Sequence, residues 1–338
     1  MSTAIFAYSR QGCQTARRIA GVLDDAPILY TAQRLSGGEF LPIPTPSQDF
    51  FGSIFARSDA MIFVCSCGIA LRHIAPHLRG KDQDPAVIVV DELGKFVIPI
   101  LSGHIGGANA LARTIATALG ATAVITTATD INRRFSVDAW AAEHNCAISS
   151  LKQAKSVSAA ILEGDVPMVS DFPIATALPP GVSLGSAGQV GFCISYRTCE
   201  PFANTLRLIP RILHLGIGCR RGTSAEQIRT AVLRVLENSG IDLRAVKCAA
   251  SIDLKADEPG LAEFCAEYGL PLSFYTAQQL KQIPGDFTPS EFVSGITGVD
   301  NVCERAACVG ADRLIVRKTA SDGVTVALAC EHWEVHFG

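Results

Sequence analysis

The chain of 338 residues lacks any apolar run as long as the roughly 18 residues that a membrane-spanning helix needs. It also lacks a basic excess, because 29 lysines and arginines stand against 32 aspartates and glutamates, and the net charge is −3. These absences argue against a membrane protein and against a nucleic-acid-binding protein. No basic stretch precedes the short apolar run at residues 4–8, so we expect no signal peptide and a cytoplasmic location.

Several catalytic motifs are also missing. No Gly-x-Ser-x-Gly elbow is present, which argues against a hydrolase of the Ser-His-Asp type. The glycines that follow the apolar run at 212–218 lack the spacing of the dinucleotide fingerprint, and no Walker-type lysine follows them. Cys65 and Cys67 precede His73 and His77, but these spacings are not those of zinc sites. We therefore predict neither a nucleotide site nor a metal site.

Cysteine, in contrast, is abundant, and the 12 cysteines are scattered along the chain. Several lie within apolar stretches, namely Cys193, Cys248, Cys265 and Cys308. Because we expect no signal peptide, the sequence favours buried, reduced thiols over a framework of disulfides.

The length and the apolar content indicate more than one domain. Hydrophobic residues make up 48% of the chain, which is ample for buried cores, and no internal repeat is present. Strand-like runs alternate with helical patterns over residues 60–126 and again from residue 211, which predicts α/β domains with mostly parallel or mixed sheets. We predict an N-terminal α/β domain over 1–131, a small and less regular middle module over 132–208, and a C-terminal α/β domain over 209–338.

The most informative stretch is a strand–loop–helix region near the end of the N-terminal domain. An apolar run over 96–100 predicts a strand, and a helix is expected over 108–119, with Gly120 placed to end it. The loop between them reads Ser-Gly-His-x-Gly-Gly-Ala-Asn and carries one imidazole, His104. Ligand sites of α/β proteins lie at strand ends, where glycines admit a ligand and helix N–H groups attract an anion. His104 is therefore a candidate base, and a merely hydrogen-bonded histidine is the alternative.

A second loop follows the apolar run at 212–218. It holds Arg220 and Arg221 just before a helix, an arrangement that favours an anion through charge and free N–H groups. A plain strand-to-helix turn is the alternative. Thr223 and Glu226 have the spacing of a capping box, which predicts Thr223 as the N-cap.

Acidic residues mark two further places in the C-terminal domain. The loop at 251–260 contains Asp253, Lys255 and Glu258 after an apolar strand, and such groups suit acid–base chemistry as well as an ordinary polar loop. Glu304 opens a predicted helix, where it either faces a cleft or stabilises the helix start.

Together these motifs resemble the cobalt-precorrin-5A hydrolase family of the anaerobic cobalamin pathway. The resemblance spans most of residues 60–330, in the family's order. In the N-terminal domain it rests on residues 68–72, Lys81, 84–87, 91–92, 102–109, 126–130 and Asp138. In the C-terminal domain it rests on residues 216–223, 250–258 and 302–307. Arg221 stands where the family commonly has lysine, which keeps the charge and changes the contact geometry.

The resemblance implies a reaction. Water opens a δ-lactone on a cobalt-bearing macrocycle, a two-carbon fragment departs as acetaldehyde, and the product is cobalt-precorrin-5B. The cobalt belongs to the substrate, so no cofactor is expected. The partner is this small, polycarboxylate corrinoid, with no nucleic acid and no membrane, and a homodimer stays open. A non-catalytic tetrapyrrole carrier is the alternative function.

Within this reaction we expect His104 to act as the base, with Asp253 and Glu258 as further catalytic groups. The backbone N–H groups of Gly106 and Gly107 are the expected oxyanion donors. The expected substrate-binding residues are Arg72, Ser102, Gly103, Gly106, Gly107, Asn109, Gly218, Cys219, Arg220, Arg221, Ser251, Lys255 and Glu304.

Overall fold

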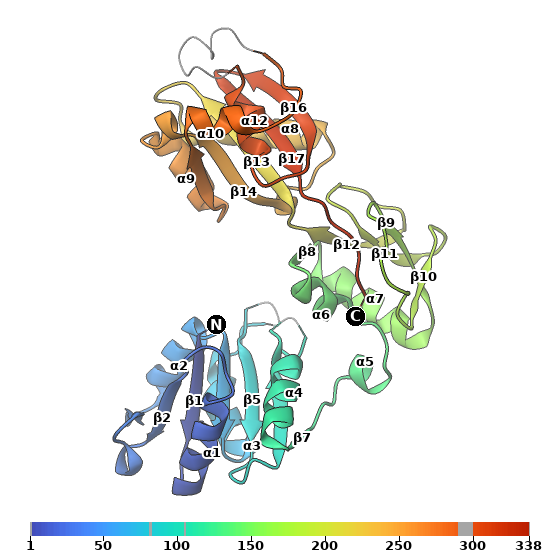
Figure 1. The fold of residues 1–338 in the computed structure, drawn as a ribbon. Coiled ribbons are helices and arrows are strands. Elements are labelled where there is room, and N and C mark those ends of the chain that lie inside the picture. The colour runs from blue at the N-terminus through green and yellow to red at the C-terminus, as the bar shows by residue number, and fades with distance from the viewer. Residues whose placement is uncertain (1, 81–82, 105, 290–299, 338) are drawn as a thin grey trace. The chain divides into compact units, whose positions relative to one another are not determined.

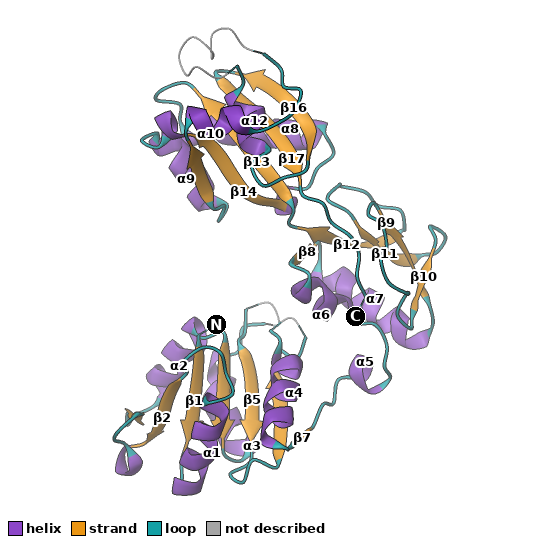
Figure 2. Cartoon of the chain, viewed as in Figure 1, coloured by secondary structure: helices purple, strands orange, loops and turns teal. Residues whose placement is uncertain are grey.

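The computed structural model describes residues 2–80, 83–104, 106–289 and 300–337, so Lys81 and Ile105 of the quoted motifs lie outside the described residues. The chain divides into two compact units, Met1–Ala142 and Glu143–Gly338 (Figure 1). The described strands form three sheets with interspersed helices, which confirms the predicted α/β class (Figure 2). The three-part division at residues 131 and 208 stays a prediction. No helix in the described ranges has the length and apolarity to cross a bilayer.

The sheet of the first unit is mixed. Its strand order is β3 (Phe40–Ile43), β2 (Ile28–Ala32), β1 (Thr3–Ala7), β4 (Ala60–Val64), β5 (Ala86–Val90), β6 (Phe96–Leu101) and β7 (Thr122–Ala123). The strands from β3 to β5 are parallel, whereas β6 runs antiparallel to β5 and pairs Leu101 with Val87. The loop after β6 therefore lies at the amino ends of the parallel strands. Ligands of α/β sheets usually bind at the carboxyl ends of the parallel strands. The position of His104 at a strand end therefore does not by itself indicate a ligand site.

Helices cover both faces of this sheet. Helices α1 (Arg10–Ala20) and α4 (Ala108–Leu119) pack on one face, and α2 (Gln48–Arg57) and α3 (Cys67–Ile74) pack on the other. Strands β1, β4 and β5 are buried along their whole length, as strands covered on both faces must be. Helix α4 ends at Gly120 in the left-handed conformation, as predicted. The unit also contains the 3-10 turns Gln33–Leu35 and Ala75–His77 and helices α5 (Ala128–Ile131) and α6 (Val137–Glu143).

The second unit contains two sheets. The first has the order β10 (Val182–Leu184), β9 (Val166–Ser170), β11 (Val190–Ile194), β12 (Asn204–Pro210) and β8 (Cys146–Ile148), with helix α7 (Leu151–Glu163). The second has the order β15 (Leu272–Tyr275), β14 (Val246–Ile252), β13 (Leu213–Cys219), β17 (Val324–Cys330) and β16 (Arg313–Ser321). Helices α8 (Ala225–Asn238) and α9 (Pro259–Glu267) cover one face of this sheet, and α10 (Ala277–Gln282) and α12 (Val302–Ala307) the other.

Two local predictions are corrected. The N-cap of α8 is Ser224 with Gln227 at the third helical position, one residue later than predicted, because the Thr223 hydroxyl donates to the Arg220 carbonyl at 2.8 Å and closes the preceding turn. The last strand-like run of the predicted pattern over 60–126, at residues 122–126, forms a strand only at Thr122–Ala123.

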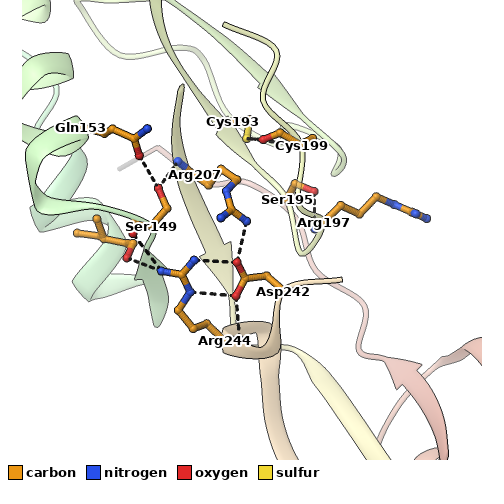
Figure 3. A network of polar contacts seen from close by, with 10 residues as sticks. Ser149, Gln153, Cys193, Ser195, Arg197, Cys199, Arg207, Asp242 and Arg244 are labelled. Carbon is orange, nitrogen blue, oxygen red and sulfur yellow. Dashed lines mark hydrogen bonds and ion pairs between the residues drawn. The ribbon is translucent and has the colours of Figure 1, made fainter. Parts of the chain in front are cut away.

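A partly buried ion cluster joins the two sheets of the second unit (Figure 3). Arg207 of β12 donates to Asp242 Oδ2 at 2.7 Å, and Arg244 donates to both carboxylate oxygens of Asp242 at 2.9 and 2.7 Å. Arg244 also donates to the carbonyls of Ile148 and Ser149 at the end of β8. Burial of Asp242 raises its pKa, but the hydrogen bonds and charges of the two arginines outweigh burial and lower it to about 2.

Candidate active site

The loop between β6 and α4 holds His104 in a fixed backbone frame. The amide of Gly107 donates to the His104 carbonyl at 2.9 Å, and the amide of Asn109 donates to the Gly103 carbonyl at 2.9 Å. The Ser102 hydroxyl donates to the Asp84 carbonyl at 2.9 Å, next to the start of β5. These bonds tie the loop to the segment before β5 and to the first turn of α4, so the imidazole is presented from a defined position.

Two residues of this loop, Ser102 and Gly106, have unusual steric constraints. Ser102 has a φ of 56°, which is costly for a residue with a side chain and is frequent at functional sites. A Cβ atom on Gly106 would lie 2.4 Å from the Ser102 Cβ, so only glycine fits there. The tight turn therefore requires this glycine for steric reasons. The Gly107 amide is already engaged by His104 and is not free to act as an oxyanion donor in this conformation.

The imidazole of His104 lies beside a carboxylate. Its Nε2 atom is 3.1 Å from the Thr129 hydroxyl and 3.7 Å from Asp130 Oδ2. The same carboxylate accepts hydrogen bonds from Asn109 Nδ2 at 3.0 Å and from Arg113 Nη2 at 2.7 Å. A positioned carboxylate next to an imidazole stabilises the imidazolium form, which is what a base becomes after it takes a proton.

The Asp130 carboxyl group is held in its ionised form. Burial raises its pKa, but hydrogen bonds from Thr127 and Arg113 and the nearby His104 together lower it. Asn109 is buried, and its Nδ2 atom donates to the Thr127 hydroxyl and to Asp130 Oδ2. Asn109 therefore positions the carboxylate in this structure through its Nδ2 hydrogens.

A cavity of about 260 Å³ opens beside this histidine. Its walls include Ser102, Gly103, His104, Asn109 and Asp138. The structure thus brings most of the predicted loop residues to one cavity. Arg72 does not line this cavity; it is exposed on α3.

A larger cavity of about 610 Å³ lies in the second unit, at the end of β13. Four cationic side chains line it, namely Arg220, Arg221, Lys255 and Lys318. The first three were predicted as substrate-binding residues, whereas Lys318 of β16 was not. Gly218 and Cys219 also line it, and the amide of Arg220 donates to the Gly323 carbonyl at 3.1 Å, which ties the loop to the turn between β16 and β17. The loop is therefore more than a strand-to-helix turn, because it forms the wall of a cationic cavity.

The acidic residues of the second unit have different environments. Glu258 is buried, and its carboxylate accepts from the Gly222 amide at 2.9 Å and from Lys255 Nζ at 3.1 Å. The Gly222 hydrogen bond is the largest cause that lowers the pKa of Glu258, burial opposes it, and Lys255 adds to it. Asp253 is exposed at the start of the 3-10 turn Asp253–Lys255 and does not line the cavity.

Two predicted substrate-binding residues are buried and bonded within the protein. The Ser251 hydroxyl donates to the Ile217 carbonyl at 2.7 Å. The Glu304 carboxylate, which is fully buried, accepts from the amide and hydroxyl of Thr288 and from the Lys318 amide at 2.6–2.9 Å. In this structure neither side chain lines the larger cavity, and neither is accessible to a substrate.

Comparison with known proteins places these two regions in one family. Residues 49–130 match the family described as Cobalamin synthesis G N-terminal, and residues 213–329 match Cobalamin synthesis G C-terminus. The cobalt-precorrin-5A hydrolase of Priestia megaterium is 32% identical over 355 residues, 96% of this chain and 94% of that protein. The cobalt-precorrin-5A hydrolase of Salmonella typhimurium is 33% identical over 353 residues, 98% of each. A crystal structure of a cobalamin biosynthesis protein G homolog from Sulfolobus solfataricus aligns over 97% of each chain, with 21% identity and a TM-score of 0.42.

The two matched domains define the class as a protein of cobalamin synthesis. The identity over nearly the whole chain goes further, and the chain belongs to the cobalt-precorrin-5A hydrolase family.

Proposed function

We propose that this chain hydrolyses cobalt-precorrin-5A. The observation that carries the proposal is the 32–33% identity, over at least 96% of the chain, to two proteins named as cobalt-precorrin-5A hydrolases. The chain is accordingly a hydrolase that acts on a cobalt corrinoid. The alternative, a non-catalytic tetrapyrrole carrier, is not favoured, because these full-length relatives are named as hydrolases.

The proposed reaction has two stages. Water adds to the lactone carbonyl, and the C–O bond breaks to give a carboxylate and an alcohol. The alcohol then loses its proton, the bond to the macrocycle breaks, and the two-carbon fragment leaves as acetaldehyde while the conjugated ring takes up the electron pair and a proton. Cobalt enters with the substrate and leaves with the product. This supports the further proposal that the protein holds no resident cofactor.

We assign the base to His104. Its Nε2 atom faces Thr129 and Asp130, so Nδ1 is the nitrogen that accepts a proton from water or from the alcohol. The ionised Asp130 stabilises the resulting imidazolium at 3.7 Å. Asp253 and Glu258 stay candidates for the second proton transfer. Of the two, Asp253 is solvent-exposed, whereas Glu258 is committed to Gly222 and Lys255.

We assign carboxylate recognition to the cationic cavity of the second unit. Arg220, Arg221, Lys255 and Lys318 offer charge-assisted hydrogen bonds to acetate and propionate side chains of a corrinoid. Apolar wall residues, including Ile252, Val302 and Val324, suit the macrocycle edge.

Isotope incorporation tests the hydrolytic assignment. Cobalt-precorrin-5A is incubated with the purified chain in H₂¹⁸O, and the corrinoid product is analysed by mass spectrometry. Hydrolysis at the lactone carbonyl places one ¹⁸O atom in the new carboxylate of each product molecule. Recovery of unchanged corrinoid from a tight complex would instead identify a carrier.

A further inference from the structure

Two cysteines that play no part in the proposed reaction lie against each other in the second unit. Cys193 belongs to β11, and Cys199 lies in the loop between β11 and β12. Their Sγ atoms are 3.4 Å apart, and Cys193 Sγ is also 3.7 Å from the Cys199 carbonyl oxygen (Figure 3). Both are free thiols. Two sulfur atoms at this separation need only a small movement of a loop side chain to bond.

The pair lies on the wall of its own cavity. The cavity has a volume of about 380 Å³, and its lining includes Ser170, Asp171, Cys193, Ser195 and Cys199. Cys193 is 1% exposed, whereas Cys199 is partly exposed. A small molecule that enters the cavity therefore meets Cys199 before it meets Cys193.

The surroundings also distinguish the two thiols. The hydrogen bond with Cys193 is the largest cause that lowers the pKa of the Cys199 thiol to about 6, while burial opposes it and Ser195 adds to it. The same hydrogen bond, together with burial, raises the pKa of Cys193. Thiolates, not thiols, attack disulfides, so Cys199 is suited to attack and Cys193 to resolve.

We propose that Cys193 and Cys199 are a redox-active pair that forms a reversible disulfide by exchange with a low-molecular-weight disulfide. The Cys199 thiolate attacks one sulfur of the small disulfide, forms a mixed disulfide and releases one small thiolate, which takes up a proton. Cys193 then loses its proton and attacks Cys199 Sγ, which expels the second small thiol. The protein loses two protons and two electrons, and the small disulfide gains them and becomes two thiols.

Peptide mapping of the full-length chain tests this proposal. The reduced protein is equilibrated with bis(2-hydroxyethyl) disulfide and 2-mercaptoethanol at increasing ratios, free thiols are blocked with N-ethylmaleimide, and peptides are identified by mass spectrometry. We expect a peptide that joins Cys193 to Cys199 and that disappears with dithiothreitol. Cys193→Ser should accumulate a hydroxyethyl mixed disulfide on Cys199, and Cys308→Ser, a matched change elsewhere in the unit, should keep the link.

Alkylation of both cysteines at the most oxidising ratio would overturn the proposal, and so would linkage of either one to a different cysteine. The wild-type map alone decides between these outcomes, so the test does not depend on the stability of any variant.

Discussion

At the scale of single residues, His104 combines limited exposure with a charged neighbour. Its side chain is 18% exposed, lines a cavity and lies 3.7 Å from an ionised Asp130. Because general-base assistance contributes about 10²–10⁴-fold in rate, His104→Asn should lower kcat by that order while corrinoid binding persists. Steady-state kinetics measures the change in kcat, and equilibrium titration with the corrinoid measures binding.

His332→Asn is the matched control, because this histidine is 73% exposed and lies far along the chain in the second unit. It should leave kcat unchanged. If His104→Asn instead keeps near-normal kcat in a folded protein, His104 is structural and the base must be sought at Asp253 or Glu258.

The sequence allowed His104 to be predicted as a candidate, because glycines surround a single imidazole. It did not reveal that Thr129 and Asp130, which belong to the quoted motif at 126–130, lie beside His104, because α5 is a four-residue helix without a readable period. Nor did it separate accessible from buried polar residues. Ser251 and Glu304 belong to quoted motifs, yet both side chains are buried and bonded within the protein.

At the scale of elements, the loop from β13 to α8 supplies two arginines to the larger cavity. Arg220→Ala or Arg221→Ala should weaken corrinoid binding by roughly 1–3 kcal/mol, the value of a charge-assisted hydrogen bond to a carboxylate. Equilibrium titration followed by corrinoid absorbance measures the change. Arg211→Ala removes an exposed arginine before the other end of β13 and should have no effect. If both loop variants bind the corrinoid as tightly as wild type, the loop is only a structural turn.

The ion cluster between the two sheets of the second unit is a stability element. Asp242→Asn should lower the free energy of unfolding by about 1–3 kcal/mol at pH 7, because it leaves Arg207 and Arg244 without their carboxylate partner. The pKa of Asp242 is lowered to about 2 in the folded chain, against about 3.9 for an unfolded aspartate. Its contribution is therefore present above about pH 4 and is lost as the pH falls through 2.

Urea unfolding of wild type and variant at several pH values tests this prediction. The difference in stability should shrink as the pH falls from 4 towards 2. A difference that does not change with pH would contradict the assigned role of the carboxylate.

Elements with strong periodicity could be predicted, and short ones could not. The strand over 96–100 and the helix over 108–119 agree with β6 and α4. The region 132–208 was read as irregular, yet it supplies most of a five-stranded sheet. Its strands are three to seven residues long, and Pro167 lies within β9, so no alternating pattern could develop. The antiparallel direction of β6 is a tertiary property, because it depends on pairing with β5.

At the scale of the whole molecule, the two cavities that we assign to the proposed reaction differ in their chemistry. The first unit offers a histidine paired with a carboxylate, and the second offers a group of cations with apolar walls. The individual residues did not distinguish a hydrolase from a non-catalytic tetrapyrrole carrier. The long motifs, and then the full-length relatives, decided for the hydrolase because they cover both units in order.

The release of acetaldehyde is the most direct test of the proposal that this chain hydrolyses cobalt-precorrin-5A. Purified chain is given an excess of cobalt-precorrin-5A without added nucleotide or metal, and acetaldehyde is quantified as its hydrazone beside the corrinoid product. For a hydrolase we expect multiple turnovers, with acetaldehyde and cobalt-precorrin-5B formed in equal amounts. Stoichiometric binding of the corrinoid without any acetaldehyde would contradict the proposal.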